Sequence, residues 1–516
     1  MLSGMLEKID TVEVASLAER RINELIVAVP EWFLTERDGK LHESLKRDEV
    51  TVLVSQGRLI LSSWTAQGTR TWRLTSWEWT GQKLLLHSSR RMGAERPLLE
   101  LIPRASAAAV VATVRGARQK RCEQLAQLAC DQLSRSKIER TALSPGVRRG
   151  QPGRYARIIL RLLHERIAVT ASVAETGRGE ADAFLSAALL WFTRTSERSR
   201  FPYIQQLWLI LEKGSIIPVL NRIVLLRDGL KSAISVFEID QAWTQLNPLE
   251  IPERRELWKK RLARFPPVSE PETSRSALAI AAQAPDAIDV AHARNGETLR
   301  YHGLPFARVR RLLGFERVWF GAEGSLRRML DESSEHEFGN LLDSLREHRA
   351  ADAVDHHHAL HRMASESWLE SLLRRDITKL DPGLIIAPLH AQFRTARGGR
   401  LGARPIDLLA LRQDGRLVVI ELKVFEDREH VLQGADYWRR VEAHRRRGHL
   451  SRAKLFGERR IRDEPPLVYL VAPTLRFHPS FRKLAQMIAG DIEIYRFDIN
   501  EDWRSGVRVM RRLRVN

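Results

Sequence analysis

The sequence predicts a multi-domain protein with a β-rich N-terminal domain and an α/β C-terminal domain, whose mixed central sheet is flanked by helices. Three patterns indicate this fold class. Short apolar runs separated by polar turns, as in 51–86, are typical of antiparallel strands. In 405–516, apolar strand-like runs alternate with helical stretches, which is typical of an α/β domain. A similar alternation in 150–265 predicts a second α/β lobe.

We expect five segments in chain order. They are a β-rich domain (1–104), a helical connector (105–149), an α/β lobe (150–265), a linker with a small α+β or helical region (266–362) and an α/β domain (363–516). A break rich in Pro and Gly at 144–153 marks one of these boundaries, and a stretch rich in Pro, Ser and Ala that begins at Phe265 marks another. In the fourth segment we expect short strands around a basic helix, 306–313.

Tryptophan is frequent in the β-rich segment. Trp72, Trp77 and Trp79 lie among arginines, an arrangement that would let bases stack on indole rings. Aromatic residues on neighbouring strands also pack against each other inside small sheets and barrels. We favour packing for each of these tryptophans.

The charge balance favours a polyanionic partner. The 516 residues include 84 Lys or Arg and 64 Asp or Glu, for a net charge of +20. Such an excess is typical of nucleic-acid-binding proteins, and we expect DNA. No long apolar span and no signal-peptide pattern occurs, so we expect no membrane partner. Cys122 and Cys130 belong to no metal or redox motif, which fits a reducing compartment and predicts a cytoplasmic protein.

The most informative stretch is a predicted hairpin that ends at Lys423. Asp407, Glu421 and Lys423 interrupt two apolar runs on either side of a turn at Gly415. Burying a charged side chain costs far more than burying an aliphatic one unless a partner, a metal or a substrate compensates it. Folding alone therefore does not explain three such groups in one hairpin.

The turn decides whether these groups meet. If the three residues that end at Gly415 form the loop, with Gly415 in the left-handed conformation, Arg412 pairs with Arg416. Asp407 then lies directly opposite Glu421. A two-residue turn would place Asp407 on the other face of the sheet. We predict the three-residue loop because it brings the charged groups together.

Two carboxylates beside a lysine suit the hydrolysis of a phosphodiester. Asp407 and Glu421 offer the oxygen ligands that a hard divalent cation prefers, Mg²⁺ with Mn²⁺ as an alternative. Such a cation polarises the phosphoryl oxygen and helps to form hydroxide from water. Lys423 would orient that water or stabilise the developing charge.

These residues resemble the signature of the PD-(D/E)XK nuclease superfamily. Pro405-Ile406-Asp407 and Glu421-Leu422-Lys423 correspond to its two half-motifs, and Gln433 and Tyr437 match the Q-x-x-x-Y element on the following helix. The chain is most similar, over 363–516, to the branch with NucS-like and Mrr-like DNA endonucleases and RecB-type nuclease domains. The resemblance implies a restriction-endonuclease-like fold, Mg²⁺-dependent DNA cleavage in repair or in restriction and defence, and a supporting catalytic role for Gln433.

The family also places a glutamate on a helix before the first strand. Residues 365–373 predict that helix, and Glu366 and Glu370 lie four residues apart on one face of it. Either could be the third metal ligand. We favour Glu370 because the adjacent leucines, Leu369, Leu372 and Leu373, are expected to face the sheet.

The expected contacts to nucleic acid come from two places. Arg397, Arg400 and Arg404 lie in a glycine-rich basic loop before the hairpin, and Tyr437 and Arg440 lie on the helix after it. Phosphate contacts of this kind set affinity and position, not sequence choice. A noncatalytic nucleic-acid-binding scaffold and an RNA-processing nuclease remain alternatives, and the sequence leaves open a homodimer.

The middle lobe resembles the C-terminal domain in its pattern. Residues 207–243 align without a gap on 467–503, and 166–173 fall on 416–423 after a gap upstream. Ala171 then replaces Glu421, and Val173 replaces Lys423. This alignment suggests a degenerate nuclease-like lobe without metal ligands, which would bind DNA or dimerise and would not cut. A chain with two such lobes would also be able to imitate a dimer.

Overall fold

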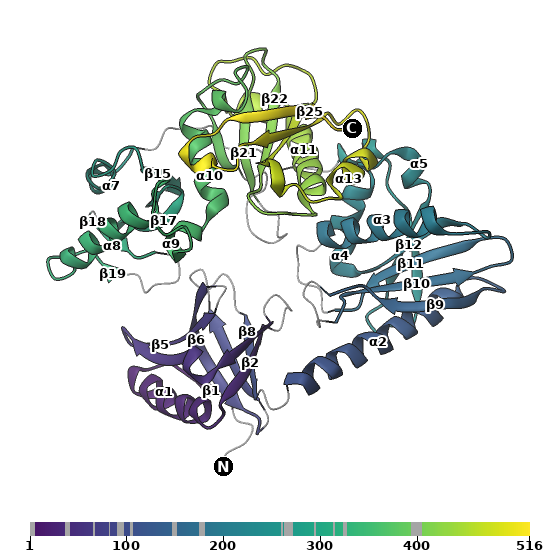
Figure 1. Cartoon of the computed structure of the whole chain (residues 1–516), viewed down its shortest axis with the longest axis horizontal. Coiled ribbons are helices and arrows are strands. Elements are labelled where there is room, and N and C mark those ends of the chain that lie inside the picture. Colours follow the sequence, from purple (N-terminus) through teal and green to yellow (C-terminus); the bar gives the residue numbers. More distant parts are fainter. Residues whose placement is uncertain are drawn as a thin grey trace. The chain divides into compact units, whose positions relative to one another are not determined.

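The computed structural model describes residues 6–36, 42–65, 68–81, 83–89, 97–103, 107–146, 152–174, 181–259, 262, 272–293, 296–312, 315–322, 328–393 and 405–516. These residues form four separate sheets (Figure 1). The chain divides into two compact units, one of 1–180, 199–213 and 237–248, the other of 181–198, 214–236 and 249–516. Within the described ranges, no helix has the length and apolar composition needed to cross a membrane.

The N-terminal part forms a nearly closed antiparallel barrel. Its elements are β1 (Glu7–Lys8), α1 (Val12–Val27), β2 (Glu31–Glu36), β3 (His42–Lys46), β4 (Val50–Ser55), β5 (Arg58–Thr65), β6 (Gly68–Trp79), β7 (Leu84–Ser89) and β8 (Leu98–Pro103). The strand order is β3-β2-β8-β7-β6-β5-β4, with β1 paired to β6. Trp72 and Trp77 are buried in its core and Trp79 packs against it, which confirms the packing interpretation of these tryptophans.

The middle of the chain forms a six-stranded mixed sheet in the order β14-β13-β12-β11-β10-β9. Its elements are α2 (Ala107–Asp131), β9 (Lys137–Leu143), β10 (Tyr155–Arg161), β11 (Arg166–Ser172), α3 (Ala181–Arg198), β12 (Ile204–Glu212), α4 (Lys213–Ile223), α5 (Asp228–Lys231), β13 (Ile234–Ile239) and β14 (Leu246–Leu249); the short α6 (Arg254–Leu257) follows. The expected connector over 105–149 therefore also contains a strand. β9 lies at the edge of the sheet and is largely exposed, so it lacks the apolar pattern that would have predicted it.

The third sheet is an antiparallel meander in the order β15-β16-β17-β18-β19. Its elements are α7 (Arg275–Ala281), β15 (Ile288–Ala293), β16 (Gly296–Tyr301), β17 (Leu304–Leu312), β18 (Phe315–Phe320), β19 (Arg328–Met329), α8 (Glu335–His348) and α9 (Ala359–Arg362). The basic helix expected over 306–313 is wrong, because β17 covers most of that range. Ala307 and Val309 are buried and alternate with Arg308 and Arg310, which is the period of a strand.

The C-terminal part forms a mixed sheet in the order β20-β21-β22-β23-β24-β25. Its elements are α10 (Ser365–Arg375), β20 (His390–Phe393), β21 (Ile406–Leu411), β22 (Leu417–Leu422), α11 (His430–Arg446), α12 (His449–Arg452), β23 (Leu467–Pro473), α13 (Phe481–Met487), β24 (Ile494–Ile499) and β25 (Val509–Arg514). α10 packs with Leu408 and Ile420 in one core, and α11 packs with Leu409 and Val419 in another. Adjacent strand residues point to opposite faces, so helices cover both faces of this sheet.

The second and fourth sheets share one topology. We call 107–249 the first repeat and 365–514 the second repeat. In chain order, the main elements of each repeat are a helix, three strands, a helix, a strand, a helix and two strands. In each sheet the strands lie side by side in the order in which they follow along the chain. β10 and β11 are antiparallel and β11 and β12 parallel, and the same holds for β21, β22 and β23. The similarity predicted between the two segments therefore extends to strand order and direction.

Candidate active site

The β21–β22 hairpin has the predicted register. Arg412 N donates to Arg416 O at 2.8 Å, and Gly415 has φ +85°, in the left-handed region. The ladder pairs Leu408 with Ile420, so Asp407 falls opposite Glu421. The three-residue loop is thus confirmed.

The three charged side chains of the hairpin meet. The Asp407 carboxylate lies close enough to Glu421 to raise the pKa of the Glu421 side chain. Lys423 Nζ lies 2.7 Å from Glu421 Oε1 and donates to Leu422 O at 3.3 Å. Asp407 Oδ2 in turn accepts the Leu422 N–H at 2.9 Å. Glu421 and Lys423 are buried, with 2% and 8% of their surface exposed, so this is an enclosed polar cluster in an apolar sheet.

Burial and mutual repulsion shape the protonation of these groups. Burial, followed by the neighbouring Asp407, raises the pKa of Glu421 well above its usual value, against the lowering effect of Lys423. Burial likewise raises the pKa of Asp407. Burial alone would lower the pKa of Lys423, but Glu421, Glu366 and Asp407 raise it on balance. Lys423 therefore keeps its positive charge, whereas the surroundings disfavour the charged forms of Asp407 and Glu421.

Both candidate glutamates of α10 border this cluster. The Glu370 side chain is 3% exposed, and burial raises its pKa. Glu366 is 46% exposed, and its Oε2 lies 4.0 Å from Lys423 Nζ. Burial raises the pKa of Glu366 as well, and Asp407 contributes to the shift of both groups. Of the two, Glu370 faces the interior as expected.

Gln392 on β20 connects Glu370 to the hairpin and is not among the predicted site residues. Its Nε2 donates to Glu370 Oε2 at 2.7 Å and to Asp407 Oδ1 at 3.5 Å. The backbone of Gln392 has φ +48°, which is costly for a residue with a side chain, and the ladder pairs the residues on either side of it but not Gln392 itself. No sequence pattern signals this position, because its role depends on an irregular edge strand.

His430, at the start of α11, is a second residue of the site that was not predicted. Its Nε2 lies 3.2 Å from Glu421 O, and its ring stacks on Phe477. Burial, reinforced by Lys423, lowers the pKa of His430 to about 3, so its ring is neutral at physiological pH. His430 thus fixes the main chain of the Glu421 strand end. Gln433, the predicted supporting residue, is buried one turn later, and its Nε2 lies 3.4 Å from Glu429 Oε2.

The expected nucleic-acid contacts receive less support. Tyr437 and Arg440 are buried, with 4% and 8% exposed, and Arg440 Nε lies 3.4 Å from Asp436 Oδ2. Because neither presents an open surface, we leave both out of the expected DNA-binding face. Arg397, Arg400 and Arg404 lie outside the described residues.

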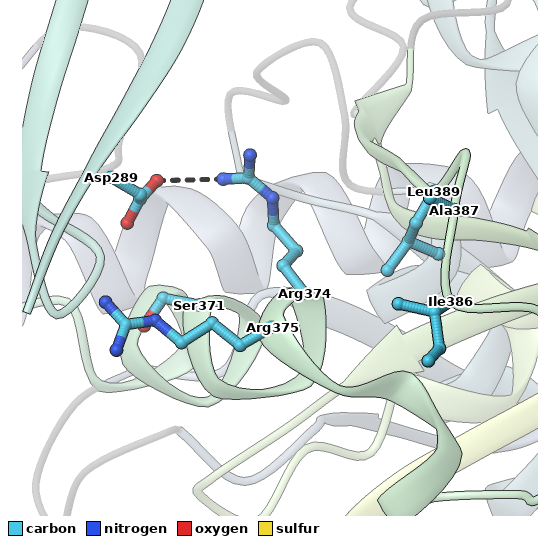
Figure 2. A pocket seen from close by; sticks show the side chains of 7 residues that line it. All are labelled: Asp289, Ser371, Arg374, Arg375, Ile386, Ala387 and Leu389. Carbon is cyan, nitrogen blue, oxygen red and sulfur yellow. Dashed lines mark hydrogen bonds and ion pairs between the residues drawn. The ribbon is translucent and has the colours of Figure 1, made fainter. Parts of the chain in front are cut away.

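The third sheet contacts α10 through two ion pairs. Asp289 and Arg300 are cross-strand partners in β15 and β16. Asp289 pairs with Arg374 at 2.9 Å, and Arg300 pairs with Glu370 at 3.6 Å. Figure 2 shows the first pair at a cavity of about 260 Å³, with the exposed Arg375 on the same helix. Arg300 of this sheet therefore pairs with Glu370, which lies one helical turn before Arg374 at the cavity.

The donor set fits a hard cation held by few protein ligands. Within the described ranges, no group of three or more His, Cys, Asp or Glu side chains is placed to hold a metal ion, so protein ligands alone do not complete a metal site there. Mg²⁺ commonly takes one or two carboxylates and completes its shell with water and substrate phosphate, whereas structural zinc needs a closed set. Asp407 and Glu421, with raised pKa values and no cysteine nearby, suit Mg²⁺ or Mn²⁺.

Comparison with protein families, with curated proteins and with solved structures gives no match for this chain.

Proposed function

We propose that this protein is a metal-dependent DNA endonuclease that hydrolyses phosphodiester bonds. The observation that carries the proposal is the contact between Asp407, Glu421 and Lys423 at the end of an otherwise apolar hairpin. A scaffold protein would gain stability from aliphatic residues at these positions, since buried charges cost free energy that apolar packing does not. The presence of three charged residues at these positions therefore supports a catalytic role for them.

The residues take distinct roles in this proposal. Asp407 and Glu421 hold the cation, which when bound polarises the scissile phosphate. Glu370, positioned by Gln392 and Arg300, is the third acidic group. Lys423 keeps its proton and orients the attacking water or stabilises the developing negative charge. His430 contacts the main chain of Glu421 and so holds the strand end that carries Glu421 and Lys423, and Gln433, one turn later on α11, takes the supporting role that the resemblance implies.

The fold and the charge support the same conclusion. The second repeat is a mixed sheet covered by helices on both faces, as expected for a restriction-endonuclease-like domain, and the chain carries a net charge of +20. An RNA-processing nuclease would use the same cluster, and DNA remains our first choice from the resemblance of 363–516 to DNA endonucleases.

A cleavage assay tests the proposal. Plasmid, branched DNA, single-stranded DNA and RNA are incubated with Mg²⁺ and the wild-type chain, Glu421→Gln or Glu458→Gln. Glu458 is the matched control, because its carboxylate is exposed and pairs with Lys454 at the surface. We expect cleavage of DNA by the wild type and Glu458→Gln and a loss of about 100-fold or more in Glu421→Gln.

The other outcomes separate the alternatives. Absence of cleavage on every nucleic acid would favour the scaffold, and cleavage of RNA alone would favour RNA processing. Equal cleavage by Glu421→Gln and wild type would place the activity elsewhere.

A further inference from the structure

We propose that the two repeats form a pseudo-dimer within one chain that holds a single competent site, so that the protein cuts one strand of a duplex per binding event. This inference rests on the proposed function and specifies its product. It is carried by the residues at the site positions of the first repeat and by the contacts between elements of the two repeats.

The first repeat has apolar residues at the three positions that carry charge in the second. Ala156 pairs with Ala171 in the β10–β11 ladder, as Asp407 lies opposite Glu421 in β21–β22. Val173 follows two residues later, where the second repeat has Lys423. The exposed fractions of Ala156, Ala171 and Val173 are 0%, 2% and 1%. The first repeat therefore keeps the hairpin and offers no acid, base or ligand there.

Segments at equivalent places in the two repeats pair with each other. In the gapless alignment of 207–243 with 467–503, Arg227 falls on Met487. Arg227 N donates to Met487 O at 2.9 Å, and Leu226 and Ile488 form an antiparallel bridge around this point. Two equivalent segments that pair antiparallel at their matched residue have the arrangement that a two-fold axis produces.

Side chains of the equivalent helices also meet reciprocally. α3 and α11 are the crossover helices of the two repeats, and α4 and α13 are the helices that follow the next strand. Arg222 of α4 lies 3.5 Å from Asp436 of α11, and Lys483 of α13 lies 2.7 Å from Glu197 of α3. Each crossover helix thus pairs with the later helix of the other repeat, and the two ion pairs use different residues of these helices.

Arg222 also binds the residue that corresponds to Asp436 in the first repeat. The patterns around Asp182 and Asp436 match, and the Arg222 guanidinium donates to both oxygens of Asp182, with Nη2 to Oδ2 at 2.8 Å. The opposing aspartates and Arg222 are nearly buried, which makes the pairing a fixed part of the fold.

One competent site has a direct consequence for the product. The two strands of a duplex are related by two-fold symmetry, and a symmetric dimer presents one site to each. In this chain the first repeat has Ala156, Ala171 and Val173 at the three positions that would have to carry a second site. The opposite strand can then be cut only after dissociation or by another chain.

The test follows the conversion of supercoiled plasmid by the full-length chain with Mg²⁺. We expect nicked circles to accumulate as the first product at every enzyme concentration, with linear DNA forming later. Linear DNA as the first product, with no nicked circle preceding it, would overturn the single-site inference and leave the nuclease proposal intact. Val173→Ala is the control in the first repeat and should leave the nicking rate within about twofold at temperatures where circular dichroism shows it folded.

A second measurement needs no cleavage. Glu421→Gln is bound to a short duplex, and the mass of the complex is determined by sedimentation. One chain per duplex supports the inference, and two chains per duplex would overturn it because two Glu421 positions would then be present. A chain that neither cuts nor binds any nucleic acid would contradict the proposed function itself.

Discussion

Ala156 lies opposite Ala171 in the β10–β11 hairpin, at the place that Asp407 and Glu421 take in β21–β22. The same hairpin topology therefore occurs once with apolar residues and once with charged residues at these positions. The first repeat fills the positions with small apolar side chains, as packing alone prefers. The second keeps carboxylates whose pKa values burial raises. The fold does not require the charges, which supports the catalytic role that we propose for them.

Removing one of these carboxylates should stabilise the cation-free protein. The pKa of the Asp407 carboxyl is higher in the folded than in the unfolded protein. The protonated carboxyl therefore adds to the stability of the fold below the unfolded pKa of about 4, and this contribution is lost as the pH rises through the pKa of the folded state. Asparagine does not ionise and can still accept the Leu422 N–H. We expect Asp407→Asn to melt a few degrees above wild type at pH 8 without added cations, since about 1 kcal/mol shifts the Tm of a large domain by about 2–4 °C.

The same variant should lose DNA cleavage, and its stability advantage should shrink towards pH 4. Thermal melts across this pH range, in the presence of a chelator, measure both trends. A lower Tm for Asp407→Asn at pH 8 would show that the carboxylate is already compensated in the cation-free protein.

Cation affinity should rise with pH. Asp407 and Glu421 must be deprotonated to bind a cation, and their raised pKa values keep protons on them at higher pH than usual. We expect Mg²⁺ or Mn²⁺ to bind about tenfold more tightly at pH 8 than at pH 6, with proton release. Calorimetry in two buffers of different ionisation enthalpy measures both quantities. Equal affinity and no proton release would exclude these carboxylates as the ligands.

The sequence predicted the parts of the site that follow from local rules. Gly415 and the alternation of faces determine the hairpin register, and the leucines beside Glu370 determine which side of α10 is buried. Gln392 and His430 could not be predicted, because their contacts depend on an irregular edge strand and on where α11 starts. The burial of Arg440 could not be predicted either, because arginine is usually exposed and its burial depends on the ion pair with Asp436.

The two α10 glutamates can be distinguished by substitution. Glu370 is the more buried, and it shares Gln392 with Asp407. Glu366 is about half exposed and faces Lys423. We expect Glu370→Gln to reduce cleavage about 10- to 100-fold and Glu366→Gln to reduce it less than about fivefold. Rates with saturating Mg²⁺ on one DNA substrate give the comparison, and the reverse order would make Glu366 the third acidic group.

Arg222 should be among the most sensitive positions for stability. Its removal leaves Asp182 without its bidentate partner and weakens the compensation of Asp436, although Arg439 still pairs with Asp436 at 2.6 Å. Breaking a buried ion pair by removing one partner costs about 3–5 kcal/mol. We expect Arg222→Met to lower the free energy of unfolding in urea by about this amount. Arg459→Met, at an exposed arginine, is the control and should change it by less than about 0.5 kcal/mol. Equal effects of the two substitutions would mean that the Arg222 cluster contributes little.

Gln392 offers a way to separate backbone strain from side-chain function. Its φ of +48° favours glycine, so Gln392→Gly should be more stable than Gln392→Ala by about 1 kcal/mol. Both variants remove the amide that links Glu370 and Asp407, and both should reduce cleavage by about tenfold because the carboxylates lose a shared donor. Urea unfolding and cleavage rates of the two variants provide the test. If Gln392→Gly retains full activity, the amide does not position the carboxylates, and the left-handed backbone serves the turn of the edge strand alone.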